Sequence, residues 1–170
     1  MTVYEAIQKR FSCRSYKPDP VPREIIEKVI AMAGQAPSAK NLQPWKFIVL
    51  TDPETRNALR QAYDREWFST APVVIAACGL MEEGWKRSWD KEDFTRVDVA
   101  IAFDHLTLAA VQEGLATCWI GAFKEDIAEK ILGVPDGVKI VAMTPLGYPA
   151  AVQPERSRKP LNEILKWEKW

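Results

Sequence analysis

The hydrophobic positions change period several times along the chain, which predicts alternating helices and strands. Ile25, Ile26, Val29 and Ile30 recur at helical spacing, and Gly34 follows them as a stop signal. By the same criteria we expect helices over residues 2–9, 22–33, 53–63, 97–111 and 125–132, and strands over residues 46–50, 73–78, 115–120 and 138–143. Such an alternation predicts an α/β or α+β sandwich.

Two segments are apolar over more than one face. Residues 73–78 form an almost continuous apolar run, which is typical of a strand buried on both faces. Residues 97–111 are apolar nearly all round, and a helix of that kind cannot lie on a surface. In a chain this small, burial on every side indicates the core of a dimer as well as the core of the subunit.

The one histidine, His105, lies inside this apolar helix beside Asp104. Adjacent residues of a helix do not face each other, so the two side chains do not form a catalytic dyad. We expect His105 to be a partly buried structural residue.

A loop of small and polar residues, 36–45, joins the helix over residues 22–33 to the next strand. Joins in α/β units are usually shorter, and loops placed by a rigid scaffold are common ligand sites. This loop concentrates amide and hydroxyl groups at Ser38, Asn41 and Gln43, between two prolines that restrict its backbone. It therefore suits the polar edge of a planar ligand, although a solvated loop explains the same composition.

A second candidate binding segment follows the first helix. If it is extended, Arg10, Ser12 and Arg14 share one side, and Phe11 and Cys13 share the other. Two guanidinium groups beside a hydroxyl suit a phosphate, because arginine presents a planar fork of donors. A solvated basic edge strand is the other interpretation. Cys13 has no histidine nearby to activate it, so we expect it to serve packing.

Residues 79–93 show no clear period and could form a mobile flap or an irregular helix. Trp85 and Trp89 lie in this segment among acidic and basic residues. Two tryptophans could cover a flat ligand, but anchoring to the core is their commoner role, and we expect anchoring here.

The composition of the chain argues against several classes of protein. The 170 residues fit one domain, and equal numbers of basic and acidic residues, 23 of each, give no overall field that favours nucleic acid or an anionic membrane. Three cysteines without CxxC spacing argue against a disulfide framework and a cysteine-based zinc site. The sequence begins with a helix signal rather than a leader, and no apolar run approaches the roughly 20 residues of a membrane span. We expect a cytoplasmic protein.

Several common catalytic motifs are absent from the sequence. It contains no GxGxxG, P-loop, GxSxG or HExxH pattern, and one histidine cannot supply a metal site of several histidines. Because side-chain acid–base groups are scarce, a bound cofactor would have to carry any difficult chemistry. We therefore predict neither a catalytic side chain nor a metal ligand.

Five sequence blocks together resemble the FMN-dependent nitroreductase family, in particular its shorter members. They span nearly the whole chain in the family's order: RFSCRSY (10–16), APSAKNLQPW (36–45), GLATCWIGAF (114–123), LGYP (146–149) and RSRKP (156–160). The resemblance implies one FMN-binding domain over residues 1–170, with residues 79–93 as a candidate flap and residues 150–170 as a C-terminal arm. It also implies an α+β fold, a sandwich with a central, mostly antiparallel sheet flanked by helices, in an intertwined homodimer with FMN at the interface.

The resemblance further implies which residues hold FMN. The residues that correspond to the phosphate site are Arg10, Ser12, Arg156 and Arg158. Arg14 corresponds to the cation at the pyrimidine edge, where it would favour the anionic reduced flavin. The loop along the ring and ribityl chain corresponds to Pro37, Ser38, Ala39, Asn41 and Gln43. Gly121 and Ala122 correspond to the turn whose backbone N–H groups meet flavin N5 and O4, and their small side chains let the backbone come close.

The activity implied is that of an NAD(P)H oxidoreductase. NADH or NADPH would give a hydride to flavin N5 and leave, and a nitro, quinone or similar small acceptor would take its place in a ping-pong sequence. The alternatives are a dehalogenating or flavin-cleaving enzyme on the same fold, a flavin-binding carrier or sensor without turnover, and a protein that binds no flavin. The sequence departs from the family at Phe11, where many relatives have a polar or basic residue, and at Asp104 and His105, which replace amides.

Overall fold

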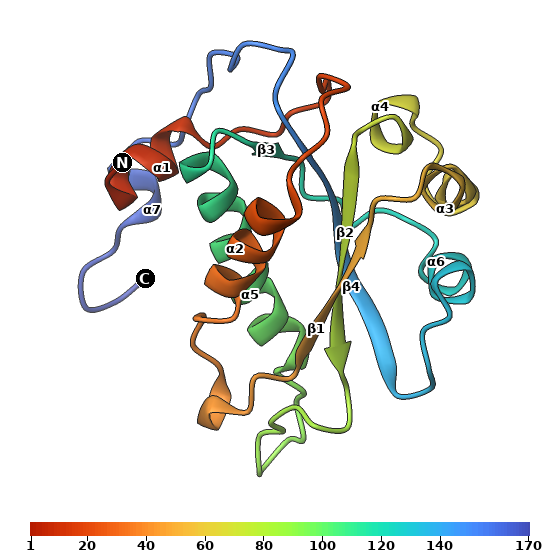
Figure 1. Cartoon of the computed structure of the whole chain (residues 1–170). Coiled ribbons are helices and arrows are strands. Elements are labelled where there is room, and N and C mark those ends of the chain that lie inside the picture. Colours follow the sequence, from red (N-terminus) through yellow and green to blue (C-terminus); the bar gives the residue numbers. More distant parts are fainter.

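The computed structural model describes all residues, 1–170, arranged around a four-stranded sheet (Figure 1). The strands are β1 (Trp45–Leu50), β2 (Val73–Leu80), β3 (Ala116–Thr117) and β4 (Val138–Gly147). The helices are α1 (Val3–Lys9), α2 (Arg23–Ala33), α3 (Pro53–Ala58), α4 (Glu66–Ser69), α5 (Thr95–Gln112), α6 (Glu125–Leu132) and α7 (Leu161–Ile164), with 3-10 turns at Ala39–Asn41 and Leu59–Gln61. No helix combines the length and the apolar character needed to cross a bilayer.

The strands are ordered β1-β2-β4-β3, and every neighbouring pair is antiparallel. Helices α2 and α5 cover one face of the sheet, and α3, α4 and α6 lie on the other (Figure 1). The predicted α+β sandwich with an antiparallel sheet is therefore confirmed.

Strand β2 is the centre of both hydrophobic cores, because all eight of its residues are buried. Val73, Ile75 and Ala77 belong to the core shared with α2 and α5, and the alternate residues Val74 and Ala76 belong to the core on the opposite face. Successive side chains of a strand point to opposite faces, which is why an apolar residue is needed at every position. The prediction of a strand buried on both faces is confirmed.

The ends of the helices follow the capping signals in the sequence. Thr2 Oγ1 accepts the N–H of Glu5 at 3.2 Å, and a carboxylate oxygen of Glu5 accepts the N–H of Thr2 at 2.6 Å. Gly133 ends α6 in the left-handed region, with φ of 62°. The helix expected over residues 53–63 instead ends at Ala58, and a 3-10 turn follows it. Because residues three apart lie on the same side of such a turn, Leu59 and Ala62 are both buried.

Strand β3 is shorter than the segment 115–120 that the apolar pattern predicts. Only two of its residues pair with β4 as a strand. The Cys118 N–H donates to Thr144 Oγ1 at 2.9 Å instead of to a main-chain carbonyl, and pairing resumes only at Ile120. The Thr144 hydroxyl has therefore replaced one main-chain acceptor between the strands, and β3 is interrupted at this point.

Residues 81–94 form an irregular hairpin rather than a helix, so the alternative of an irregular helix was wrong. Arg87 donates its N–H to Glu92 O at 2.9 Å, and its guanidinium pairs with the carboxylates of Asp90 and Glu92. These contacts close the turn and leave Trp89 77% exposed, so the expected anchoring to the core is wrong for this residue. Trp85 packs edge-on against Phe94, with ring centroids 5.2 Å apart.

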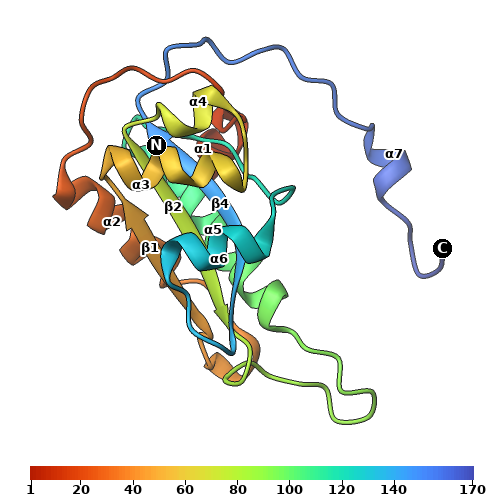
Figure 2. The same ribbon diagram turned by 90° about the vertical axis from the view of Figure 1, so that its right-hand side faces the viewer.

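Helix α5 is not enclosed on every side within one chain. Val99, Phe103 and Leu106 are buried against the sheet and α2, but Val97 is exposed and Ile101 is half-buried on the remaining face. The C-terminal residues 150–170 stay on the body as far as Arg156, which donates to Gln8 O, and the part that carries α7 then extends away from it (Figure 2). The large apolar side chains of its last part are exposed: Leu161, Ile164, Trp167 and Trp170.

Replacing Gly147 by alanine should destabilise the fold by about 1–3 kcal/mol. A Cβ at this position would lie 2.8 Å from Cγ of Pro72, a rigid ring that cannot turn aside, and 3.2 Å from Tyr16. Gly121→Ala is the matched control, since the nearest atom to its added Cβ is 3.9 Å away. Urea unfolding would show a lower midpoint for Gly147→Ala alone; equal midpoints for the two variants would contradict the steric explanation.

Candidate functional site

The segment after α1 lies against β3 and presents alternating side chains. Ser12 forms a parallel bridge with Thr117, and the Cys13 N–H donates to Thr117 O at 2.9 Å. Cys13 is fully buried, whereas Ser12 and Arg14 are exposed. The extended conformation and the packing role of Cys13 are therefore confirmed, and the polar side of the segment is available at the surface.

The C-terminal segment returns to this same edge and adds two guanidinium groups. Arg156 donates from Nη2 to Gln8 O at 2.7 Å and from Nη1 to Arg10 O. Burial and the nearby charges of Arg158 and Arg10 lower the pKa of Arg156 below its usual value. Arg156 therefore contacts the backbone of Arg10 and lies near Arg158, and none of the three arginines forms an ion pair in the chain. Together they form a cationic cluster that an anion with several charges would relieve.

Arg14 lies on the same edge but its side chain is directed to α4. Its guanidinium carbon is 5.9 Å from the centre of the Trp67 ring. Burial raises the pKa of the Cys118 thiol, an effect that Arg14 and the Ser12 hydroxyl partly offset, so all three groups lie close together. Arg14 is therefore next to the arginine cluster and turned towards an aromatic surface.

Gly121 and Ala122 follow β3 in an exposed turn near this edge. Neither of their backbone N–H groups donates a hydrogen bond within the chain. Inside the subunit, nothing crowds a side chain at Gly121, whose nearest atom is Trp119 Nε1 at 3.9 Å. Two free donors and an open surface are what close approach of a polar ligand requires.

The loop with Pro37, Ser38, Ala39, Asn41 and Gln43 has an unusual backbone. Lys40, Asn41 and Gln43 have φ of 52°, 57° and 52°, in the left-handed region, although none is glycine. Ser38 Oγ accepts the Gln43 N–H at 2.9 Å, and Gln43 Nε2 donates to Asn41 Oδ1 at 3.1 Å. Residues with strained backbones often cluster at ligand sites.

The structure does not bring this loop to the arginine cluster within one chain. The loop is fixed to the first turn of α5 by Asp98, whose Oδ1 accepts the Ala39 N–H at 3.0 Å. Beyond the last turn of α5 the chain enters β3, beside Ser12, at the opposite end of the molecule (Figure 1). With 18 residues, α5 is about 27 Å long, so the two groups of residues are separated by most of that length.

Sequence reasoning did not identify Asp98 as part of this region. It is one of two acidic residues of α5 and is 3% exposed, whereas the other, Asp104, is exposed. A carboxylate between the apolar residues Val97 and Val99 was the available signal, because a buried charge needs a specific partner.

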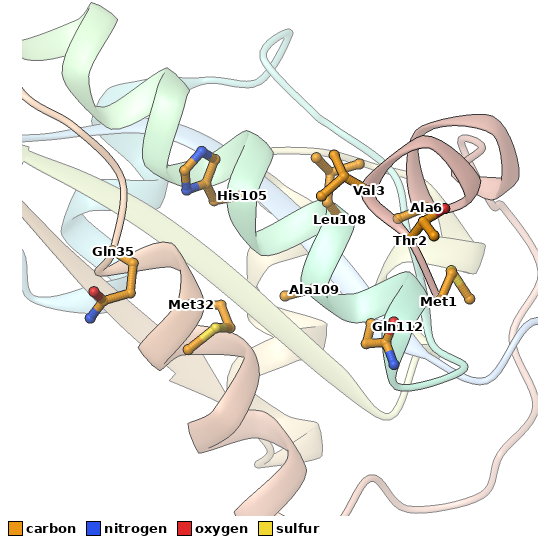
Figure 3. Close-up of a pocket in the computed structure, with 10 residues that line it drawn as sticks. All are labelled: Met1, Thr2, Val3, Ala6, Met32, Gln35, His105, Leu108, Ala109 and Gln112. Atoms are coloured by element: carbon orange, nitrogen blue, oxygen red, sulfur yellow. The ribbon is translucent and has the colours of Figure 1, made fainter.

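A groove of about 370 Å³ lies between α1, α2 and α5 (Figure 3). Its lining is mostly apolar and includes Val3, Met32, Leu108 and Ala109, with His105 at one side. His105 is half-buried, as expected, and makes no hydrogen bond with Asp104. The groove lies on the uncovered side of α5 and holds none of the predicted flavin-binding residues.

Fold and site together define an α+β protein with a cationic cluster at one end of its long helix and a polar loop at the other. A family model described as the nitroreductase family matches residues 7–67 and 59–148. The chain therefore belongs to the nitroreductase family of oxidoreductases, as the sequence blocks predicted.

Relatives and solved structures support this membership. The chain is 31% identical to an NADH dehydrogenase of Thermus thermophilus, over 95% of this chain and 94% of that protein. It is 29% identical to iodotyrosine deiodinase 1 of Rattus norvegicus, over 95% of this chain and 68% of that protein. The crystal structure of a nitroreductase family protein from Clostridium difficile covers all of both chains with a TM-score of 0.93 and 32% identity.

Replacing Arg158 by alanine should weaken anion binding at the cluster. Inorganic phosphate at about tenfold its Kd adds about 1.4 kcal/mol to stability, so it should raise the Tm of the wild-type protein by a few degrees. We expect less than half of this rise in Arg158→Ala. Lys159→Ala removes the same charge from the next residue and should behave as the wild type. Thermal unfolding at constant ionic strength measures the effect, and equal rises in all three proteins would argue against a specific site.

Proposed function

We propose that this protein is an FMN-dependent NAD(P)H oxidoreductase that reduces nitro, quinone or similar small acceptors in a ping-pong sequence. The observation that carries the proposal is the arginine cluster at the edge formed by β3 and the segment of Ser12, together with the free N–H groups of Gly121 and Ala122 in the turn that follows β3. The arginine cluster offers positive charge to a phosphate, and the two N–H groups offer hydrogen-bond donors to a planar, polar ring. Family membership and the similarity to an NADH dehydrogenase support the same reaction class.

The phosphate of FMN fits the cluster on charge and on hydrogen-bonding capacity. Arg10, Arg156 and Arg158 would offset a dianion, and the exposed Ser12 hydroxyl would add a donor. Arg156 is already tied to the backbone on one side, so it supplies a fixed positive charge with little further loss of side-chain freedom.

The ring end is assigned to Arg14, Gly121 and Ala122, together with Pro37, Ser38, Ala39, Asn41 and Gln43. When bound, FMN would supply a position, N5, that accepts a hydride from NADH or NADPH and passes it to the second substrate. The chain's own role is to orient the ring with the two free N–H groups, to place the Arg14 cation beside it, and to leave one face open. No side chain of this chain is required as a catalytic acid.

A homodimer would unite the two separated parts of the site. Because the loop and the arginine cluster lie at opposite ends of α5, we infer that the loop of one subunit completes the site of its partner. The groove beside the uncovered face of α5 offers a mostly apolar surface for the partner (Figure 3). The exposed apolar side chains of the C-terminal arm would also be covered in an intertwined dimer.

Reductive dehalogenation is the alternative with a specific observation behind it. Several curated relatives are iodotyrosine deiodinases, which match 95% of this chain at 26–29% identity. The same flavin-binding residues would serve both reactions, so the acceptor alone distinguishes them. A likeness to a BluB-like flavoprotein, at 23% identity, extends to the fold alone.

The purified protein, as isolated or after incubation with FMN, should show a visible flavin absorbance band. Anaerobic NADH or NADPH should bleach this band, and a nitroaromatic or quinone should restore it. A halogenated phenol that restores the band instead would favour the dehalogenase. A band that neither nucleotide bleaches would favour a carrier or sensor, and the absence of any band after incubation would overturn the proposed function.

Ile101→Glu should disrupt the dimer, because it replaces an apolar side chain on the uncovered face of α5 by a charged one. Sedimentation should give a mass near twice the 19.3 kDa of one chain for the wild type and near one chain for the variant. The affinity of the variant for FMN should fall because its dimer dissociates, although its arginine cluster is intact. Lys130→Glu on α6 introduces the same side chain, with an even larger change of charge, at an exposed position of the other layer and should leave both properties unchanged. A monomeric variant that binds FMN normally would contradict a shared site.

A further inference from the structure

We infer that Asp98 is a positioning residue that holds the loop 37–43 in the conformation that meets the flavin ring. The inference rests on the proposed function and adds to it a residue outside the set assigned to flavin contact. Asp98 acts through the Ala39 backbone and would not touch the cofactor.

The carboxylate of Asp98 is buried and hydrogen-bonded to the loop. It is 3% exposed, and Oδ1 accepts the Ala39 N–H at 3.0 Å across 59 positions of sequence. Oδ2 is buried and receives no hydrogen bond in the chain. The next loop N–H, that of Lys40, donates to no group either, so the carboxylate has capacity for a second loop donor.

Helix α5 does not need the Asp98 carboxylate to cap its N-terminus. The first N–H of the helix, on Thr95, donates to Asp93 Oδ1 at 2.8 Å, so Asp93 already supplies an acceptor there. The Asp98 backbone N–H donates to Phe94 O in the ordinary helical pattern. A buried, half-satisfied carboxylate costs stability unless its partner compensates, and the partner here is the loop.

The loop depends on this contact because its other hydrogen bonds are local. Within residues 37–43, the bonds of Ser38, Asn41 and Gln43 join residues at most five positions apart. The Asp98–Ala39 bond is the one that joins these residues to a distant element. Three non-glycine residues in the left-handed region persist only where the surroundings fix them, and Asp98 supplies the fixed point.

The test compares FMN with riboflavin, which has the ring and ribityl chain but no phosphate. A residue that positions the ring loop should weaken both ligands by the same factor, whereas a defect at the phosphate end should weaken FMN alone. We expect Asp98→Ala to bind both ligands about 10- to 100-fold more weakly, which corresponds to the loss of a charge-assisted hydrogen bond. Asp98→Asn keeps an acceptor of the same shape and should recover affinity to within about fivefold of wild type.

Thr107→Val is the matched control on the same helix. Its hydroxyl is also buried and hydrogen-bonded, to Asp104 O at 2.9 Å, but it lies nine residues, about 14 Å, further along α5. This variant should lower the Tm of the flavin-free protein without changing either affinity. Fluorescence titration gives the affinities, and visible circular dichroism of bound flavin reports the ring environment.

The outcomes separate the inference from the proposed function. Wild type that binds no flavin would overturn the proposed function. Wild type that binds FMN, with Asp98→Ala and Thr107→Val equally affected or equally unaffected, would overturn the role of Asp98. A loss in Asp98→Ala that is confined to FMN would also overturn it, because the defect would then lie at the phosphate end.

Discussion

The length of α5 is the constraint on which the arrangement of the site depends. Its first turn holds the polar loop through Asp98, and its last turn leads into β3 beside Ser12. A rigid helix of about 27 Å keeps these regions apart in every copy of the chain. Oligomerisation is therefore a requirement of the proposed site rather than an addition to it.

The strand β2 fixes that helix in place. Because all eight of its residues are buried, the sheet cannot tilt against α5 on one face without disturbing α3, α4 and α6 on the other. The arginines of the cluster, in contrast, lie outside the four strands, at the start of the extended segment after α1 and on the C-terminal arm. This division places the apolar core inside the sheet layers and the cationic cluster at the surface, where hydrogen bonds to Gln8 O and Arg10 O hold Arg156.

Much of the fold could be predicted from hydrophobic period and from capping signals. The apolar run of β2, the capping box at Thr2 and the stop at Gly133 each depend on neighbouring residues alone, and the structure agrees with them. The failures involve polar contacts, which hydrophobic period does not report. The Thr144 hydroxyl that interrupts β3 belongs to a distant strand, and the ion pairs of Arg87, although local, depend on how the charged side chains fold back on the hairpin.

The candidate site divides in the same way. The residue types in the loop and around Arg10 indicated anion and ring recognition, and the family resemblance supplied their roles. Their separation within one chain, and the buried partner of Ala39, follow from the path of α5 and could not be seen in composition or spacing.

A site divided between two copies has a genetic consequence. In the proposed dimer, a subunit without its arginines would still lend its loop to a normal partner, and a subunit with a damaged loop would still lend its arginines. Two different defective alleles expressed together could then assemble one complete site per mixed dimer, alongside one that carries both defects. Loss of function at this locus would depend on which half of the site each allele had lost.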